Sequence, residues 1–298
     1  MALPVAGLHG AHLRADLVRR LGRARVENAV AAGEVRPLWR GVVVDSRRLL
    51  DPLTRAAAAL LTAGPRSVIT GVTAAALHGC RAVESPVTHI LVPYGCETRS
   101  RKGLVVHHAR PFADDVIELD GLRALPLDRV IADLLCTLPE ADALAVADEA
   151  LRVAGGDRGT FRKEVAERLR TREDNRGTVR AAGLLDLVSD GVDSPAESWL
   201  RLKVIDKGFP VPEVNWVIPR PDGTVLYRLD LAWPRLRIAL EYDGVEAHSG
   251  REAHDEARRA DLGARGWIVV VARSEDLRSF SRVAGELRAA FARRGYTW

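Results

Sequence analysis

The sequence predicts an α/β protein of several domains, each of mixed α+β composition. Its 298 residues suit two domains with room for a third small module, and a hydrophobic content of 47% supports a core in each. Over residues 191–298 the spacing of apolar residues follows the order helix, strand, strand, strand, helix, strand, which is typical of a mixed sheet flanked by helices. At the other end, two helical patterns precede a pair of alternating strands. The chain thus divides into four segments, which are 1–50, 51–125, 126–190 and 191–298.

The first segment has the pattern of a winged helix-turn-helix. LRADLVRRLG is a candidate helix ending at Gly22, and ARVENAVAAG is a second ending at Gly33, because glycine commonly follows the last helical residue. EVRPLWRGVVVDS then predicts a hairpin with its turn near Arg40 and Gly41. This order is typical of DNA-binding modules. We expect DNA contacts from six arginines, although a solvated helix face would also explain each of them: Arg19, Arg20, Arg23, Arg25, Arg36 and Arg40.

The two middle segments predict a small α/β module and a helical connector. In 51–125, PLTRAAAALLTAG and GVTAAALHG are typical of short helices, and THILVP and LVVHHAR of strands. His78, His107 and His108 have no acidic or cysteine partner at ligand spacing, so we interpret them as packed or surface residues. In 126–190, three stretches with apolar residues three and four apart predict a helical bundle, and the polar stretch TREDNRGTVRAAGLLDLVSDGVD marks the boundary that follows.

Composition narrows the class of function. The net charge is +4, the pI is about 9.2, and lysine occurs at only four positions, so nearly all cations are arginines, which suit bidentate phosphate contacts. The three cysteines are far apart without a CxxC pair, which argues against disulfides and zinc. No apolar run of membrane-spanning length and no signal-peptide pattern is present, so we expect a soluble cytoplasmic protein without a membrane partner.

Acidic residues are concentrated in one stretch, Arg228 to His248. Alternating apolar residues predict two antiparallel strands joined by a tight turn near Arg235, and this register places Asp230 opposite Glu241. Asp243 shares the face of Glu241, because alternate residues of a strand point the same way. Three converging carboxylates repel one another unless a proton or a cation joins them, and oxygen ligands favour Mg²⁺ or Mn²⁺. This indicates a phosphodiester-cleaving centre; solvated turn residues are the alternative.

Two further residues, Glu197 and Arg258, belong to this prediction. Ser194, Pro195 and Glu197 form the pattern of a capping box, so Glu197 has a structural explanation besides a catalytic one. Arg258, on the helical pattern after His248, is placed to steady a phosphate or the acids, and a solvated helix face explains it equally well.

The last segment resembles the PD-(D/E)xK nuclease superfamily, and within it the family similar to very-short-patch-repair endonucleases. The motifs are SPAESWL, RLDLAWP, EYDG with the histidine that follows, and ARGWIVVVAR, over roughly residues 190 to 294. The resemblance implies a restriction-endonuclease-like domain with Asp230 as a metal-binding acid and Glu241 as the second acid. Asp243 falls where many members have lysine, and no lysine follows Lys207. Because very-short-patch-repair enzymes place histidine near here, His248 becomes the expected proton acceptor.

The first half resembles AbiE-type antitoxins and transcriptional regulators. The similarity rests on WRGVVV, AAALLTAGPRSVIT, AAALHG, HHARPF and LRALPLDRVIADLL, over roughly residues 5 to 150. It implies a winged helix followed by a small α/β module.

Together these patterns predict a Mg²⁺- or Mn²⁺-dependent DNA endonuclease with a winged-helix DNA-binding module. A non-catalytic DNA-binding regulator or antitoxin-like protein that retains a nuclease fold is the alternative, and an RNA target is a third reading. The sequence leaves open whether the protein forms a homodimer and whether it has a toxin or repair partner.

Overall fold

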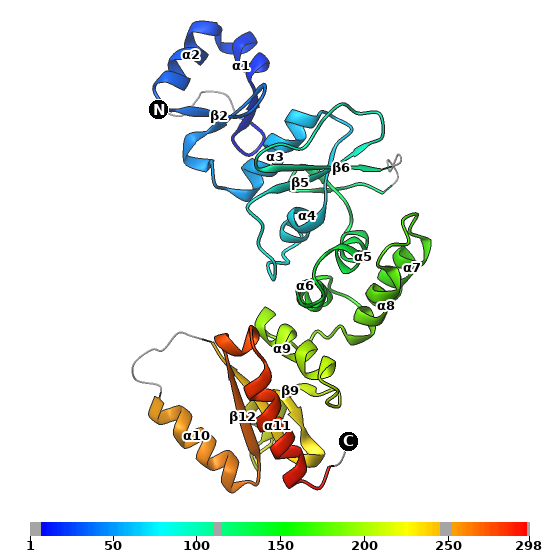
Figure 1. Cartoon of the computed structure of the whole chain (residues 1–298). Helices are drawn as coiled ribbons and strands as arrows, with labels where there is room; N and C mark the ends of the chain where they lie inside the picture. The colour runs from blue at the N-terminus through cyan, green and yellow to red at the C-terminus, as the bar shows by residue number, and fades with distance from the viewer. Residues whose placement is uncertain (1–6, 110–114, 245–251, 297–298) are drawn as a thin grey trace. The chain divides into compact units, whose positions relative to one another are not determined.

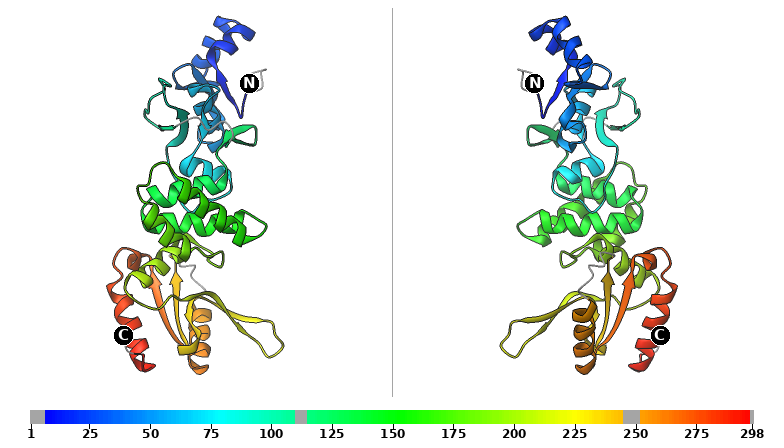
Figure 2. Two further views of the ribbon diagram at one scale, coloured as in Figure 1. Left: turned by 90° about the vertical axis from the view of Figure 1, so that its right-hand side faces the viewer. Right: turned by 90° about the vertical axis from the view of Figure 1, so that its left-hand side faces the viewer.

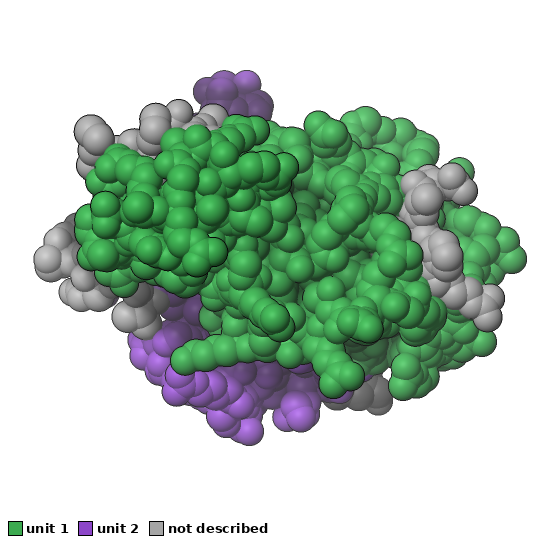
Figure 3. Space-filling view, turned by 90° about the horizontal axis from the view of Figure 1, so that it is seen from above, with its two compact units in different colours: residues 1–137, 153–182 green, residues 138–152, 183–298 purple. Residues whose placement is uncertain are grey.

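The structure is a computed structural model of the whole chain and describes residues 7–109, 115–244 and 252–296, with side chains omitted for 252–255. It forms two compact units, coloured separately in Figure 3. Unit 1 consists of Met1–Thr137 and Val153–Ala182, and unit 2 of Leu138–Arg152 and Gly183–Trp298. The predicted helical connector is therefore divided between the two units.

Unit 1 begins with two helices packed on a three-stranded antiparallel sheet of order β1-β3-β2. Both predicted helices and the hairpin are confirmed, and β1 is an additional strand. Gly22 and Gly33 have φ of 83° and 70°, a conformation that favours glycine and ends each helix at the expected place. The hairpin β2–β3 turns at Arg40 and Gly41, and we call it the wing. The elements are β1 Ala11–Leu13, α1 Arg14–Leu21, α2 Arg23–Ala31, β2 Val35–Trp39 and β3 Val42–Asp45.

The rest of unit 1 is a five-stranded mixed sheet of order β6-β5-β4-β8-β7 covered by helices. The predicted helices and the two longer strands are confirmed, whereas three short strands escaped prediction. Helix α3 contacts both β1 and β5 and so joins the two sheets of this unit. The elements are α3 Pro52–Ala63, β4 Val68–Ile69, α4 Gly71–Leu77, β5 Thr88–Pro93, β6 Leu104–Ala109, β7 Ile117–Leu119, β8 Leu122–Ala124, α5 Leu127–Thr137 and α7 Arg158–Thr171.

Two helices lie at the division between the units, α6 Glu140–Val153 and α8 Thr178–Leu187. The stretch TREDNRGTVRAAGLLDLVSDGVD, which the sequence predicted to be a polar boundary, therefore contains α8. In this helix Asp186 is exposed, Thr178 and Arg180 are half-buried, and Ala181, Leu184 and Leu185 are buried.

Unit 2 is a four-stranded sheet of order β12-β11-β10-β9 with helices on both faces (Figure 1). The strands are antiparallel except for the parallel pair β11–β12, so the predicted mixed sheet is confirmed. Helices α9 and α11 pack on the face that carries Leu231 and Leu240, and α10 packs through Leu262 on the face of Ala232 and Ala239. The elements are α9 Pro195–Asp206, β9 Glu213–Pro219, β10 Val225–Trp233, β11 Ile238–Asp243, α10 Glu252–Ala264, β12 Ile268–Arg273 and α11 Ser281–Arg293.

The hairpin β10–β11 has the predicted register. It turns through Pro234–Leu236 and pairs Leu231 with Leu240 at the end of the ladder, so the opposed positions just beyond that pair are Asp230 and Glu241. The neighbouring hairpin β9–β10 extends beyond the helices of this unit (Figure 2). Taken together, the chain is a mixed α/β protein, as predicted. Within the described residues, no helix is long and apolar enough to cross a membrane.

Candidate functional site

Two carboxylates stand opposite each other near the end of the β10–β11 hairpin in unit 2. Glu241 is only 8% exposed and Asp230 is half-buried. The Tyr242 backbone N–H donates a hydrogen bond to Asp230 Oδ2 at 2.8 Å. The strand backbone therefore holds the Asp230 carboxylate toward β11, beside Glu241.

Arg258 of α10 binds the second acid. Its Nη1 and Nη2 donate to the two Glu241 oxygens at 2.7 and 2.6 Å, and Nη2 also donates to the Arg228 carbonyl at 2.7 Å. The guanidinium lies 5.5 Å from the centre of the Tyr227 ring. Of the roles predicted for Arg258, these contacts correspond to steadying the acids.

Glu197 has the predicted capping role. Ser194 begins α9: its Oγ accepts a hydrogen bond from the Glu197 N–H at 3.3 Å and donates one to Glu197 Oε1 at 2.7 Å. The Asp193 N–H donates to Glu197 Oε2 at 3.0 Å, in place of the N-cap N–H expected for a complete capping box.

Capping does not remove Glu197 from the acid cluster, because its charge interacts with Asp230. Burial raises the pKa of Glu197, and repulsion from Asp230 and Asp193 acts in the same direction. Burial likewise raises the pKa of Asp230, and repulsion from Glu241 and Asp193 raises it further. The Tyr242 hydrogen bond and the charge of Arg258 lower it, but they do not cancel the rise. The site therefore favours a bound proton or cation.

Asp193 was missed by the sequence reasoning. It reaches the cluster from the loop before α9, where Asn215 Nδ2 donates to its Oδ2 at 2.8 Å. Asn215 adopts φ 48°, a left-handed conformation that asparagine tolerates better than most residues. Nothing in the local pattern around Asp193 indicates this contact, because Asn215 lies 22 positions further along the chain.

The other predicted members lie less centrally. Asp243 is exposed at the end of β11, and His248 falls outside the described residues. Across the parts of the chain whose side chains are described, no three His, Cys, Asp or Glu side chains are gathered closely enough to hold one metal ion. The predicted convergence of Asp230, Glu241 and Asp243 on one metal is therefore not seen. The physical reason is that Asp243 is exposed at the end of β11, while Arg258 already binds both oxygens of Glu241.

The acids nevertheless fit a hard cation in part. Mg²⁺ commonly takes only one or two protein carboxylates and completes its shell with water and substrate phosphate. Asp230 and Glu241 are adjacent and lie beside two further acids, which gives the site an excess of negative charge. A cation that binds Glu241 would compete with Arg258.

In unit 1, the predicted DNA-binding arginines fall into two groups. Arg19 forms an ion pair with Asp16, and Arg25 approaches Glu34 at 4.0 Å. The other four are exposed, and none forms an ion pair with a described residue: Arg20, Arg23, Arg36 and Arg40. An exposed cation without a protein partner is available for a phosphate.

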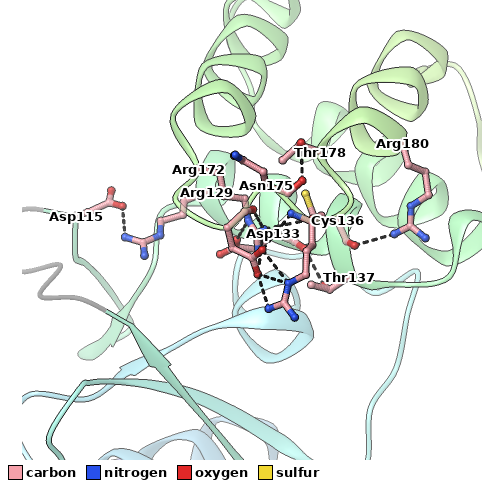
Figure 4. Close-up of polar contacts among 11 residues, drawn as sticks. Asp115, Arg129, Asp133, Cys136, Thr137, Arg172, Asn175, Thr178 and Arg180 are labelled. Carbon is pink, nitrogen blue, oxygen red and sulfur yellow. Dashed lines mark hydrogen bonds and ion pairs between the residues drawn. The ribbon is translucent and has the colours of Figure 1, made fainter.

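Other arginines of unit 1 are used internally, as Figure 4 shows. Arg172 Nε donates to Asp133 at 2.9 Å, Arg129 Nη1 to Asp115 at 2.6 Å, and Arg180 Nη2 to the Cys136 carbonyl at 2.8 Å. Two of these contacts tie α5 to segments that follow α6, and the contact with Asp115 ties α5 to the segment before β7. We therefore interpret this network of arginines as structural.

The histidines also have partners within unit 1. His78 Nε2 lies 2.9 Å from the Leu125 carbonyl oxygen. His107 Nε2 lies 3.0 Å from Nδ1 of His89, which the sequence reasoning did not single out. The two rings are nearly parallel, with 17° between their planes and centroids 5.3 Å apart, and the short distance between the nitrogens shows that one ring donates its N–H to the other.

The fold and site define a protein class with two compact α/β units, exposed arginines in the first and an acid cluster in the second. No family model matches the sequence. The chain is 32% identical over 273 residues to the uncharacterized proteins MT2308 and Rv2248 of Mycobacterium tuberculosis, strains CDC 1551 and H37Rv, over 91% of this chain and 96% of each relative. The chain belongs to the same family as these two mycobacterial proteins.

Proposed function

We propose that the chain is a Mg²⁺- or Mn²⁺-dependent DNA endonuclease that acts in the cytoplasm. The observation that carries the proposal is the acid cluster around Asp230. Half-buried carboxylates that repel one another cost stability, and a bound cation would offset that cost. The resemblance of residues 190 to 294 to PD-(D/E)xK nucleases assigns the same two acids, Asp230 and Glu241, to the metal.

The chain's own residues have distinct roles in this proposal. Asp230 and Glu241 hold the cation, with Asp243 assisting directly or through water. A divalent cation, when bound, supplies charge neutralisation at the scissile phosphate and promotes ionisation of water. Arg258 positions Glu241 through its paired hydrogen bonds. His248 accepts the proton of the attacking water, as the resemblance implies, and Glu197 adds negative charge from the start of α9.

In unit 1, the exposed arginines would hold the DNA backbone. Phosphate contacts position a protein on DNA without reading its sequence, so any specificity would come from α2.

One observation favours the alternative of a DNA-binding regulator without catalysis. Both oxygens of Glu241 are already bound by Arg258, so its guanidinium group takes the place that a metal ion would have at the second acidic position. The absence of lysine after Lys207 points the same way.

The test is cleavage of mixed DNA substrates, including supercoiled, mismatched and single-stranded DNA, with Mg²⁺ or Mn²⁺ and with a chelator. We expect metal-dependent cleavage that falls by at least about 100-fold in Asp230→Ala and Glu241→Ala. Glu118→Ala, which removes an exposed acid on β7, serves as the control and should cleave like the wild type. Wild-type rates in Asp230→Ala would refute the assignment. Salt-sensitive DNA binding without cleavage of any substrate would support the regulator.

A further inference from the structure

The connection between β5 and β6, residues 94–103, follows the edge of the sheet in unit 1 (Figure 1). Because β5 and β6 are parallel, this connection must return along the full length of β6. Hydrogen bonds attach it to that strand. The Tyr94 N–H donates to the Ala109 carbonyl at 2.8 Å, and the Val106 N–H donates to Ser100 Oγ at 2.9 Å.

Three cations stand on this attached connection, Arg99, Arg101 and Lys102. All three are exposed, and none forms an ion pair with a described residue. This contrasts with the arginines of α7, several of which bind carboxylates within the unit. Three neighbouring positive charges repel one another, so the surface favours an anionic partner.

The same connection is joined to the wing. Trp39 Nε1 donates to the Lys102 carbonyl at 3.1 Å, and Arg55 lies over the Trp39 ring at 5.9 Å from its centre. Arg40 follows Trp39 directly in the wing turn. The wing turn, with Arg40, therefore lies next to the Lys102 end of the connection.

The far end of the connection carries an exposed aromatic residue. Tyr94 is 64% exposed, and its ring lies at 18° to that of His108 with centroids 6.5 Å apart. Beside it is a shallow hollow of about 590 Å³, lined by Gly95, Cys96, Glu97, Thr98, Arg99 and His108. A tyrosine exposed to this degree offers a flat face on which a base can stack, and Glu97 can accept a hydrogen bond from the amino group of a base.

We propose that residues 94–103 bind a nucleic-acid strand that leaves the wing, with phosphates at Lys102, Arg101 and Arg99 and an unpaired base stacked on Tyr94. The six residues of β6 span about 20 Å at ~3.3 Å per residue, which is the length of about six stacked nucleotides at ~3.4 Å along one strand. The inference rests on the DNA binding proposed for the wing and specifies a preferred ligand, a duplex with a single-stranded tail.

The test is binding of the full chain, in chelator, to a labelled blunt duplex and to the same duplex with a tail of about eight nucleotides. We expect the wild type to prefer the tailed duplex by about fivefold or more, since stacking of one base contributes roughly that factor. The triple variant Arg99→Ala, Arg101→Ala, Lys102→Ala should bind the tailed duplex about tenfold more weakly and lower the salt slope by about 2. Tyr94→Ala should lose the preference for the tail, and Tyr94→Phe should keep it.

A matched control removes three exposed charges elsewhere, Lys163→Ala, Lys207→Ala and Arg293→Ala, and should bind like the wild type. Equal affinities of the two triple variants would overturn the inference, as would a wild type that binds both duplexes equally. A wild type that binds neither duplex would refute both the proposed DNA binding and this inference. Loss of binding in Arg36→Ala, Arg40→Ala with no effect of the connection variant would refute only this inference.

Discussion

At the scale of single residues, Asp230 has an unfavourable electrostatic environment for a carboxylate. It is half-buried, it faces Glu241 across the ladder, and its charge also interacts with Glu197 and Asp193. The hydrogen bond from the Tyr242 N–H stabilises the charged form but does not overcome burial. Such a residue is costly to the fold, which is common where function requires charge.

Replacing this carboxylate with an amide should stabilise the protein at neutral pH. The pKa of Asp230 is raised above its ordinary value of 3.8. The favourable contribution of this carboxyl group to the free energy of unfolding is therefore complete below pH 3.8, and it is lost as the pH rises through the raised pKa. Asp230→Asn keeps an acceptor for the Tyr242 N–H and has no charge to bury. Between pH 4 and pH 8 in urea unfolding, its advantage over the wild type should grow to the order of 1 kcal/mol.

The control for this measurement is Asp243→Asn, which changes an exposed carboxylate two residues beyond Glu241 and should leave the pH dependence unchanged. A wild type whose stability rises from pH 4 to pH 8 relative to Asp230→Asn would contradict the expected sign.

At the scale of elements, a buried ion pair anchors α9, which carries Glu197, to α6. Asp148 and Arg201 are 2% and 3% exposed, and Arg201 Nη2 donates to the two Asp148 oxygens at 3.0 and 2.9 Å. Ser198 Oγ donates to Asp148 Oδ2 at 2.7 Å, and the Ser189 N–H donates to Oδ1 at 2.6 Å. One carboxylate thus joins α6, α9 and the segment between α8 and α9.

Removing one partner of this pair should be far more damaging than removing both. Asp148→Ala leaves the Arg201 charge buried without its carboxylate, and we expect a loss of about 3–5 kcal/mol in the free energy of unfolding. Asp148→Leu combined with Arg201→Met should recover much of that loss, because neither side chain then carries a charge. Urea unfolding of the single and double variants measures the difference. A double variant no more stable than Asp148→Ala would show that the pair contributes through specific geometry.

At the scale of the whole molecule, the proposed binding and chemistry lie in different compact units. The exposed arginines belong to unit 1, and the acid cluster belongs to unit 2, whose sheet has its own core. Side chains that contact only the phosphates far from the reacting bond affect binding more than the chemical step.

The two activities should therefore be separable by substitution. Arg36→Ala with Arg40→Ala should raise KM for cleavage about tenfold with little change in kcat, and should lower the salt slope of binding by about 2. Asp230→Ala should bind DNA in chelator as tightly as the wild type. Arg19→Ala is the control, because its charge is already paired with Asp16 and its loss should have a smaller effect. Equal losses of kcat and kcat/KM in the wing variant would contradict this separation.

Much of the secondary structure could be predicted because local chemistry specifies it. Gly22 and Gly33 end α1 and α2 through positive φ, and Ser194 starts α9 through its Oγ. The short turn Pro234–Leu236 leaves one register for the apolar residues of β10 and β11, so the pairing of Asp230 with Glu241 was predictable too. The strands β4, β7 and β8 were missed because runs of two or three residues contain too little alternation.

The partners of the acids depend on contacts that no local pattern contains. Arg258 binds Glu241 from 17 residues away, and Arg201 binds Asp148 from 53 residues away. Amino-acid spacing determines periodicity, caps and turns, because these involve neighbours along the chain. Which charge meets which across the core depends on how helices pack on sheets, so packing placed Arg258 on Glu241, brought Asp193 and Glu197 beside Asp230, and joined the Lys102 backbone to Trp39.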